Sequence, residues 1–281
     1  MNYLKYISLV LAIVVFSAYY NPQQLSENVK KHDLTIVNSW ELPDALREVS
    51  GIDWIGDDKL AAIEDEDGII YIYDLKAKKI TKEIEFADDG DYEGIAVNGK
   101  NAYVMRSDGL LFEALNYQSD QIITKTYQSK MSHKNNVETL ALDAKNNRLL
   151  TAPKDEDPND ENIKGVYAFD LKGQAMLSDL IFKVDMKDKA LKDYEEKKSY
   201  KTFRPSDLAV HPKTGELYVL EGVNPKLLIM NKNGDIKNVF KLDKDDFAQP
   251  EGITFSPDGR LFISNEAHGK MATILEVRLN E

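Results

Sequence analysis

The chain has 281 residues, of which 42% are hydrophobic and 30% are charged, and its formal net charge is −12. Such an acidic chain is a poor partner for nucleic acid, because phosphate binding needs clustered Lys and Arg. Cysteine is absent, which excludes disulfide bonds, thiolate zinc sites and a cysteine nucleophile.

The N-terminal residues predict export. Lys5 precedes a short apolar run from Ile7 to Tyr19, and this order is typical of a secretory signal. Cleavage after Ala18 would place the bulky Phe16 at position −3, so a retained membrane anchor is the alternative. We therefore expect residues 1–20 to be a signal peptide or anchor and the polar residues 21–33 to be a linker. The protein would then lie in the periplasm or cell envelope.

The rest of the chain repeats a short signature, an acidic residue followed by small and apolar ones. It begins at positions 45, 45, 69 and 44 residues apart, namely at Glu48, Glu93, Glu138, Asp207 and Glu251. A period of about 45 residues is that of a β-propeller blade. We therefore predict an all-β fold, with residues 34–281 forming a single β-propeller domain.

Each signature opens a predicted hairpin of two apolar strands around a polar turn, such as SPDGR or KNNR, and further strands follow. The last unit has only three strands, and residues 34–41 are predicted to supply the fourth and close the ring. This gives five blades. The charged segments 153–164 and 186–203 are interpreted as loops, the second with a helical turn; a degenerate sixth blade is the alternative.

The five signature acids are candidate metal ligands, because each precedes the innermost strand of its blade. In a propeller these positions converge on the central channel, and clustered carboxylates call for a compensating cation. With few His and no Cys, Ca²⁺ is favoured over Zn²⁺. The alternative is structural, with each acid accepting backbone N–H groups and joining neighbouring blades. The predicted ligands are Glu48, Glu93, Glu138, Asp207 and Glu251.

A second set of residues ends the first hairpin of each blade and differs between blades, as a binding pocket requires. Its basic members could hold an anionic group; internal salt bridges are the alternative. The predicted ligand-binding residues are Glu64, Arg106, Lys154 (with Pro153), Glu221, Asn265 and Glu266.

The ordered motifs LREVSGIDW, IEDEDGIIYIYDL, DYEGIAV, NVETLALD, FRPSDLAVHP and QPEGITFSPDGRLFISNE resemble the SdiA-regulated (YjiK-like) family. The resemblance covers roughly residues 34–279 and implies a propeller fold, an extracytoplasmic location and a calcium-associated centre, but no activity. More distantly, the blades look like those of gluconolactonase-like and strictosidine-synthase-like propellers.

Two functions follow as hypotheses. The first is a monomeric, calcium-binding module that binds a small ligand or an envelope protein. The second is a metal-dependent hydrolase of lactones, esters or phosphoesters. No local nucleophile motif such as G-x-S-x-G supports the hydrolase.

Overall fold

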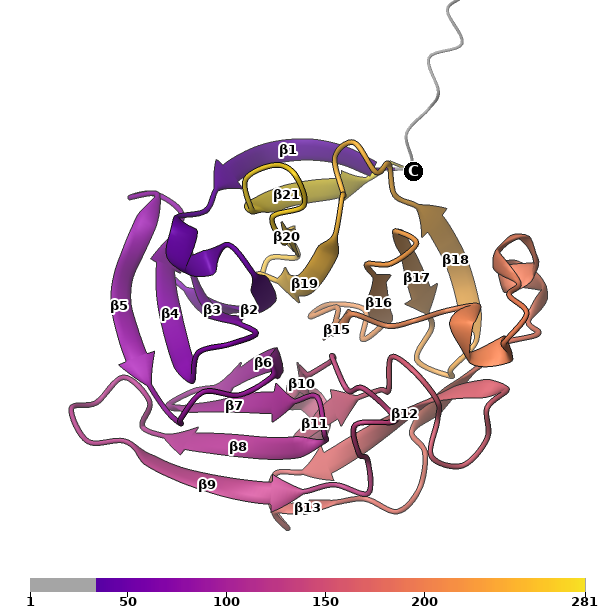
Figure 1. Cartoon of the computed structure of the whole chain (residues 1–281), viewed down its shortest axis with the longest axis horizontal. Coiled ribbons are helices and arrows are strands. Elements are labelled where there is room, and N and C mark those ends of the chain that lie inside the picture. Colours follow the sequence, from indigo (N-terminus) through magenta and orange to yellow (C-terminus); the bar gives the residue numbers. More distant parts are fainter. Residues whose placement is uncertain (1–33, 281) are drawn as a thin grey trace, which may run out of the picture. The chain divides into compact units, whose positions relative to one another are not determined.

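Five antiparallel sheets stand in a ring around a central axis in the computed structural model, which describes residues 34–280 (Figure 1). The five-bladed propeller is therefore confirmed. The first two blades are regular four-stranded meanders. Blade 1 contains β2 (Val49–Gly56), β3 (Lys59–Glu64), β4 (Ile69–Asp74) and β5 (Lys79–Glu85), and blade 2 contains β6 (Tyr92–Asn98), β7 (Asn101–Arg106), β8 (Leu110–Leu115) and β9 (Ile123–Gln128).

Blade 3 is less regular, because its outer edge is divided between two short strands. Both pair with β12, one at each end. The blade contains β10 (Ala141–Asp143), β11 (Arg148–Thr151), β12 (Ile163–Asp170), β13 (Ala175–Met176) and β14 (Phe182–Asp185). Blade 4 returns to four strands, β15 (Asp207–Val210), β16 (Leu217–Glu221), β17 (Lys226–Met230) and β18 (Ile236–Lys241).

Blade 5 joins the two ends of the domain. It contains β19 (Pro250–Phe255), β20 (Leu261–Asn265) and β21 (Thr273–Leu279), and β1 (Leu34–Glu41) pairs with β21 as its outermost strand. The predicted closure of the ring by residues 34–41 is confirmed. Because β1 and β21 come from opposite ends of the domain, their ladder of hydrogen bonds holds the ring shut.

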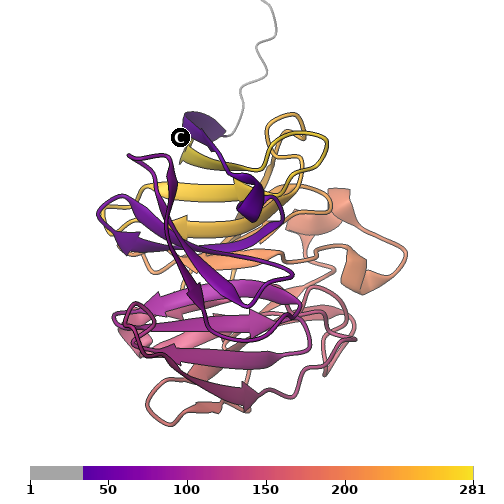
Figure 2. The same cartoon turned by 60° about the vertical axis from the view of Figure 1, so that its left-hand side comes forward.

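The long connections in blades 3 and 4 form loops rather than a sixth blade. Short 3₁₀ turns interrupt the second of them, as predicted, at η3 (Lys189–Tyr194) and η4 (Ser199–Lys201). This segment, orange in Figures 1 and 2, projects at the edge of the ring. Two further 3₁₀ turns lie at η1 (Asp44–Leu46) and η2 (Ala144–Asn146).

The hydrophobic core lies between the blades. The buried apolar side chains of the described residues form five clusters, one at each contact between neighbouring sheets. Strands β3, β16 and β20 are buried along most of their length, which matches their almost unbroken apolar sequences.

The innermost strands pack closely enough to need glycine. A Cβ atom on Gly94 of β6 would lie 2.8 Å from the backbone nitrogen of Leu140, and one on Gly252 of β19 would lie 3.0 Å from that of Ile52. Glycine removes this clash and lets the strands meet around the channel.

The segment predicted to direct export, residues 1–20, and the predicted linker, residues 21–33, lie outside the described residues. Among residues 34–280, no helix is long and apolar enough to cross a membrane.

Candidate functional site

Hairpin register determines which residues surround one end of the channel. Three of the inner strands pair Val49 with Glu64, Tyr92 with Arg106, and Pro250 with Asn265, and a bridge in blade 3 joins Val137 to Pro153. In blade 4 the first pair of the ladder is Asp207 with Leu220, one pair nearer the hairpin turn than the pairs given for the other blades. The residue next along the chain in blades 1, 2, 3 and 5, and the residue before Asp207 in blade 4, are therefore equivalent: Ser50, Glu93, Glu138, Ser206 and Glu251.

The predicted ring of five acids is thus a ring of three glutamates and two serines. Glu48 lies two residues before the ring position, with its side chain 43% exposed and 3.8 Å from Arg47. Asp207 lies one residue beyond it, where blades 1, 2 and 5 have glycine. Only Glu93, Glu138 and Glu251 combine a carboxylate with the ring position.

Asp207 joins blades. Its carboxylate accepts the backbone N–H of Leu140 at 3.3 Å and of Ile253 at 2.8 Å, from the blades on either side, and only 1% of the residue is exposed. Burial raises the pKa of Asp207 well above its usual value. This arrangement is the structural alternative considered for the signature acids.

Asp53 of β2 has the same role, and sequence analysis missed it. It accepts the backbone N–H of Val97 at 2.7 Å and the hydroxyl of Thr254 at 2.8 Å, and so links blade 1 to blades 2 and 5. Burial raises the pKa of Asp53 to about 6.

Two cations act on the ring glutamates: Lys154, and Arg204, whose charge acts on Glu138 and Glu251. The Lys154 ammonium forms an ion pair with the Glu138 carboxylate, with their side chains only 13% and 5% exposed. Although burial opposes the charge of Lys154, the carboxylates of Glu138, then Glu251 and Glu93, hold its pKa above its usual value. Lys154 is one of the predicted ligand-binding residues, and it belongs to the same site as the predicted metal ligands.

The negative charge of this group exceeds the charge of Lys154. Burial, with repulsion from Glu138 and Asp91, raises the pKa of Glu93 to about 9. Burial raises the pKa of Glu138 to about 8, against the attraction of Lys154. Burial also raises the pKa of Glu251. The three carboxyl groups therefore favour protonation or an additional cation.

Two further acids extend the group from the loops of blades 1 and 5. Asp65 and Glu266 follow the inner hairpin of their blades at the offset of Lys154 in blade 3. Burial, then the charges of Glu251 and Glu48, raise the pKa of Glu266 to about 7, and burial and Glu48 raise the pKa of Asp65. Together these residues form what we call the mouth cluster: Asp65, Glu93, Glu138, Lys154, Glu251 and Glu266.

Not every polar atom of the mouth cluster has a hydrogen-bond partner. The Oδ1 atom of Asp65 is buried without a hydrogen-bond partner. Glu266 accepts a hydrogen bond from the Gln249 side chain. At the equivalent loop position of blade 4 stands Gly222, where a Cβ atom would lie 2.9 Å from Glu251 Oε1, so the glycine makes room for that carboxylate. Asp65 is not among the residues predicted from the sequence, although its offset matches that of Lys154 and Glu266.

Four of the predicted ligand-binding residues are occupied by contacts within their own blades. Glu64 accepts the backbone N–H of Glu66 and Asp67, whereas Arg106 forms a two-pronged salt bridge with Asp108 at 2.8 and 3.0 Å. The other two are Glu221, in a buried ion pair with Lys226, and Asn265, whose amide donates to Thr273. These contacts match the alternative of internal pairing.

The mouth cluster fits Ca²⁺ in donor chemistry. Its donors are carboxylate oxygens, which Ca²⁺ prefers, and the buried Asp65 oxygen is available to a cation. Within residues 34–280, however, no three His, Asp or Glu side chains stand close enough to hold one metal ion together.

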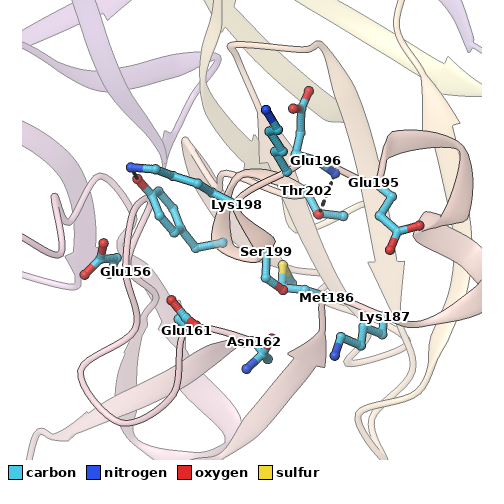
Figure 3. Close-up of a pocket in the computed structure, with 12 residues that line it drawn as sticks. Glu156, Glu161, Asn162, Met186, Lys187, Glu195, Glu196, Lys198, Ser199 and Thr202 are labelled. Atoms are coloured by element: carbon cyan, nitrogen blue, oxygen red, sulfur yellow. Dashed lines mark hydrogen bonds between the residues drawn. The ribbon is translucent and has the colours of Figure 1, made fainter.

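A separate pocket of about 560 Å³ lies between the loops at 153–164 and 186–203 (Figure 3). Four glutamates and three lysines line it, so its charges nearly balance. No member of the mouth cluster lines this pocket. The two loops are joined instead by Arg204, whose guanidinium contacts the Asp155 carboxylate at 2.7 Å.

Comparison with known proteins supports the fold and identifies the family. No curated protein matches the chain. The crystal structure of a Myxococcus xanthus glutaminyl cyclase is similar with a TM-score of 0.63 at 14% identity, covering 88% of this chain and 96% of that one, a likeness that extends to the fold alone. A chain of a mitotic checkpoint complex reaches a TM-score of 0.49 at 12% identity, over 91% of this chain and 96% of its own. The profile of the SdiA-regulated family matches residues 25–267, nearly the whole propeller, and the chain belongs to that family.

Proposed function

We propose that this SdiA-regulated propeller is an exported or membrane-anchored binding module of the cell envelope that holds Ca²⁺ at its mouth cluster. The observation that carries the proposal is the surplus of negative charge there: one buried and two half-buried glutamates meet the charge of Lys154 and that of Arg204, which is itself paired with Asp155. Clustered buried carboxylates are costly unless a cation compensates them. The ligands would come from Glu93, Glu138 and Glu251, and their carboxylates would have to draw closer together around the ion than they stand in this structure.

The surrounding residues support a module that binds a ligand beside the ion. Bound Ca²⁺ would neutralise the glutamates and offer free coordination positions to an oxygen-bearing ligand. Asp65 and Glu266, on the loops of blades 1 and 5, would accept hydrogen bonds from that ligand. Glu48 lies near enough to raise the pKa of both, and it remains a candidate at the rim.

Thermal unfolding of the full-length protein tests the metal. After chelation, Ca²⁺ at about 100 times its dissociation constant should stabilise the fold by roughly 2.7 kcal/mol, or about 5–10 °C in Tm. The double variant Glu93→Gln, Glu251→Gln should lose this response. A control variant with Glu83→Gln and Glu85→Gln, both exposed on β5, removes the same charge elsewhere and should keep it. A wild-type Tm that does not change when Ca²⁺ is added would overturn the proposal.

Cell fractionation tests the location separately. The full-length protein should appear in the periplasmic or membrane fraction, and a variant lacking residues 1–20 should stay in the cytoplasm. Equal distribution of the two forms would remove the role proposed for the N-terminal segment.

A second candidate function, a metal-dependent hydrolase, is favoured by Glu266. Burial and the neighbouring carboxylates raise the pKa of Glu266 to about 7 in the metal-free site, which suits general acid–base work at neutral pH. On a panel of lactones, esters and phosphoesters, a hydrolase should show Ca²⁺-dependent turnover that Glu266→Gln lowers about 100-fold or more with Ca²⁺ affinity preserved. Absence of turnover across the panel would leave the binding module as the function.

A further inference from the structure

A further pocket lies between blades 4 and 5, at the end of the ring away from the mouth cluster. Its volume of about 500 Å³ falls within the range of small-molecule sites, roughly 300–1,000 Å³. On β19, Glu251 of the mouth cluster stands next to the first residue, whereas Phe255, the last residue, lines this pocket. We call it the base pocket, and its apolar and aromatic lining comes from His211, Tyr218, Phe255, Leu261, Val277 and Leu279.

The lining combines an apolar floor with an aromatic wall. The leucine and valine side chains belong to the apolar cluster between blades 4 and 5 or pack against it. The ring centroid of Phe255 lies 4.8 Å from that of His211 and 4.9 Å from that of Tyr218, at interplanar angles of 61° and 87°. Aromatic rings favour this edge-to-face packing, so the wall suits a further aromatic ring.

The hydroxyl group of Tyr218 has no hydrogen-bond partner among residues 34–280. Only 6% of the residue is exposed, and burial raises its pKa, so the group stays a protonated donor at neutral pH. Polar groups of such deeply buried side chains are normally paired, because an unmade hydrogen bond is costly. Since Tyr218 lines the base pocket, a ligand bound there would supply the missing acceptor.

His211 supplies a second donor to the same pocket. Its Nδ1 accepts the backbone N–H groups of Lys213 and Thr214, each at 3.2 Å, and burial lowers the pKa of the ring. A neutral imidazole whose Nδ1 is an acceptor carries its proton on Nε2. The ring centroids of His211 and Tyr218 lie 5.9 Å apart, so both donors belong to one site.

Gly259, which also lines the pocket, leaves space beside the His211 donor. A Cβ atom on this glycine would lie 3.7 Å from His211 Nε2 and 3.6 Å from the Lys213 ammonium. The space that a side chain would fill is therefore bordered by one N–H donor and one positive charge. An anionic acceptor fits such a space better than a cation does.

The carboxylates that line the base pocket already have partners. Asp258 lies 3.5 Å from Arg260, and Glu276 accepts the Asn38 amide at 2.8 Å. Arg278, in contrast, lines the pocket and forms no ion pair within residues 34–280. The charge left free at the pocket is therefore positive, which favours a carboxylate over an ammonium group.

We propose that the base pocket binds a small aromatic carboxylate, whose ring packs against Phe255 and the apolar floor and whose carboxylate accepts hydrogen bonds from Tyr218 and His211. The site needs neither the mouth cluster nor a metal ion, so it goes beyond the function proposed above and does not depend on it. A ligand held there contacts two blades at once and would stabilise the folded ring.

Calorimetric titration of the full-length protein, in chelator at neutral pH, tests the site with phenylacetate and its cationic analogue phenethylamine. Phenylacetate should bind with a Kd of roughly 0.1–1 mM, at least about tenfold more tightly than phenethylamine. Tyr218→Phe keeps the ring and removes the donor, so it should weaken phenylacetate binding about tenfold. The Tm of this variant should equal that of wild type, because the hydroxyl has no internal partner.

Two further variants test whether the effect belongs to this pocket. Tyr200→Phe removes a hydroxyl group from the pocket between the two long loops and should leave the affinity unchanged. Val37→Trp places a bulky ring at a lining position that is 47% exposed. It should therefore block phenylacetate binding without disturbing the core.

The results also separate this inference from the proposed function. Equal binding of phenylacetate by wild type and Tyr218→Phe would overturn the inference, as would tighter binding of phenethylamine or no binding up to roughly 10 mM. A Tm of Tyr218→Phe below that of wild type would show that the hydroxyl has an internal role, and would overturn it too. None of these results bears on Ca²⁺, which the Tm response of the chelated protein tests at the mouth cluster.

Discussion

The buried carboxylate of Asp53 predicts that the propeller becomes more stable when the pH falls below neutral. Its pKa is raised from 3.8 to about 6, because burial outweighs the hydrogen bonds from Val97, Thr254 and Trp54. The folded state therefore binds a proton more tightly than the unfolded chain does. Stability from this group is absent above pH 6 and is gained as the pH falls from 6 toward 3.8.

The two pKa values give the size of the effect. A shift of about two units corresponds to roughly 3 kcal/mol between the protonation states. Between pH 7 and pH 4.5 about 2 kcal/mol of this should appear in the free energy of unfolding. The carboxyl groups of Asp207 and the mouth cluster shift in the same direction and add to the total, so the contribution of Asp53 needs a comparison with a variant.

The comparison is with Asp53→Asn, which keeps the shape of the side chain and removes its titration. Urea unfolding in chelator can be followed by the fluorescence of Trp40 and Trp54, the two tryptophans of the chain. The stability difference between wild type and variant should move by about 2 kcal/mol in favour of wild type on going from pH 7 to pH 4.5. A difference that stays constant over this range would refute the reasoning.

Three further changes test how the blades are held together. Asp207→Ala leaves the buried N–H groups of Leu140 and Ile253 without acceptors and should cost about 3 kcal/mol in urea unfolding; a loss below about 1 kcal/mol would contradict a blade-joining role. Lys226→Met leaves the buried Glu221 carboxylate without its partner and should lower the free energy of unfolding by roughly 3–5 kcal/mol. Adding Glu221→Gln should recover much of this loss. No recovery would show that the loss comes from packing instead. Gly94→Ala places a methyl group 2.8 Å from the Leu140 backbone and should lower stability by roughly 1–3 kcal/mol. Scanning calorimetry of the variant measures this loss, and a Tm equal to that of wild type would contradict it.

The fold was predictable because each blade repeats a pattern set by local physics. Alternating apolar strands and turns with glycine or asparagine recur in each blade, at a spacing near 45 residues in three of the four intervals, and the turn residues Asn147 and Gly259 do adopt positive φ. The closing strand, residues 34–41, was predictable because the last repeat has only three strands of its own and needs a fourth. The division of the outer edge of blade 3 between β13 and β14 was not visible, because a break in a strand depends on where loops pack.

The site was predicted less well, because side-chain direction depends on register. Three of the five signature acids, Glu93, Glu138 and Glu251, do occupy the ring position. In blades 1 and 4 the signature was aligned on the nearest acidic residue, Glu48 or Asp207. Strand pairing in these hairpins places Ser50 and Ser206 at the ring position instead. A slip of one residue turns a side chain to the other face of a strand. Asp207 therefore meets the backbone of neighbouring blades.

The blades differ chemically at the ring position of the inner strands and again at the loop position just after each inner hairpin. The residues just after the inner hairpins, Asp65 in blade 1, Lys154 in blade 3, Gly222 in blade 4 and Glu266 in blade 5, can change without disturbing the hydrogen-bonded ladder. They determine where charge is concentrated, with acids on blades 5 and 1 and the ammonium on blade 3. The lysine therefore balances one side of the mouth, and the carboxylates of Asp65 and Glu266 add negative charge on the side of blades 5 and 1. A cationic or hydrogen-bond-donating part of a ligand would be held on that side.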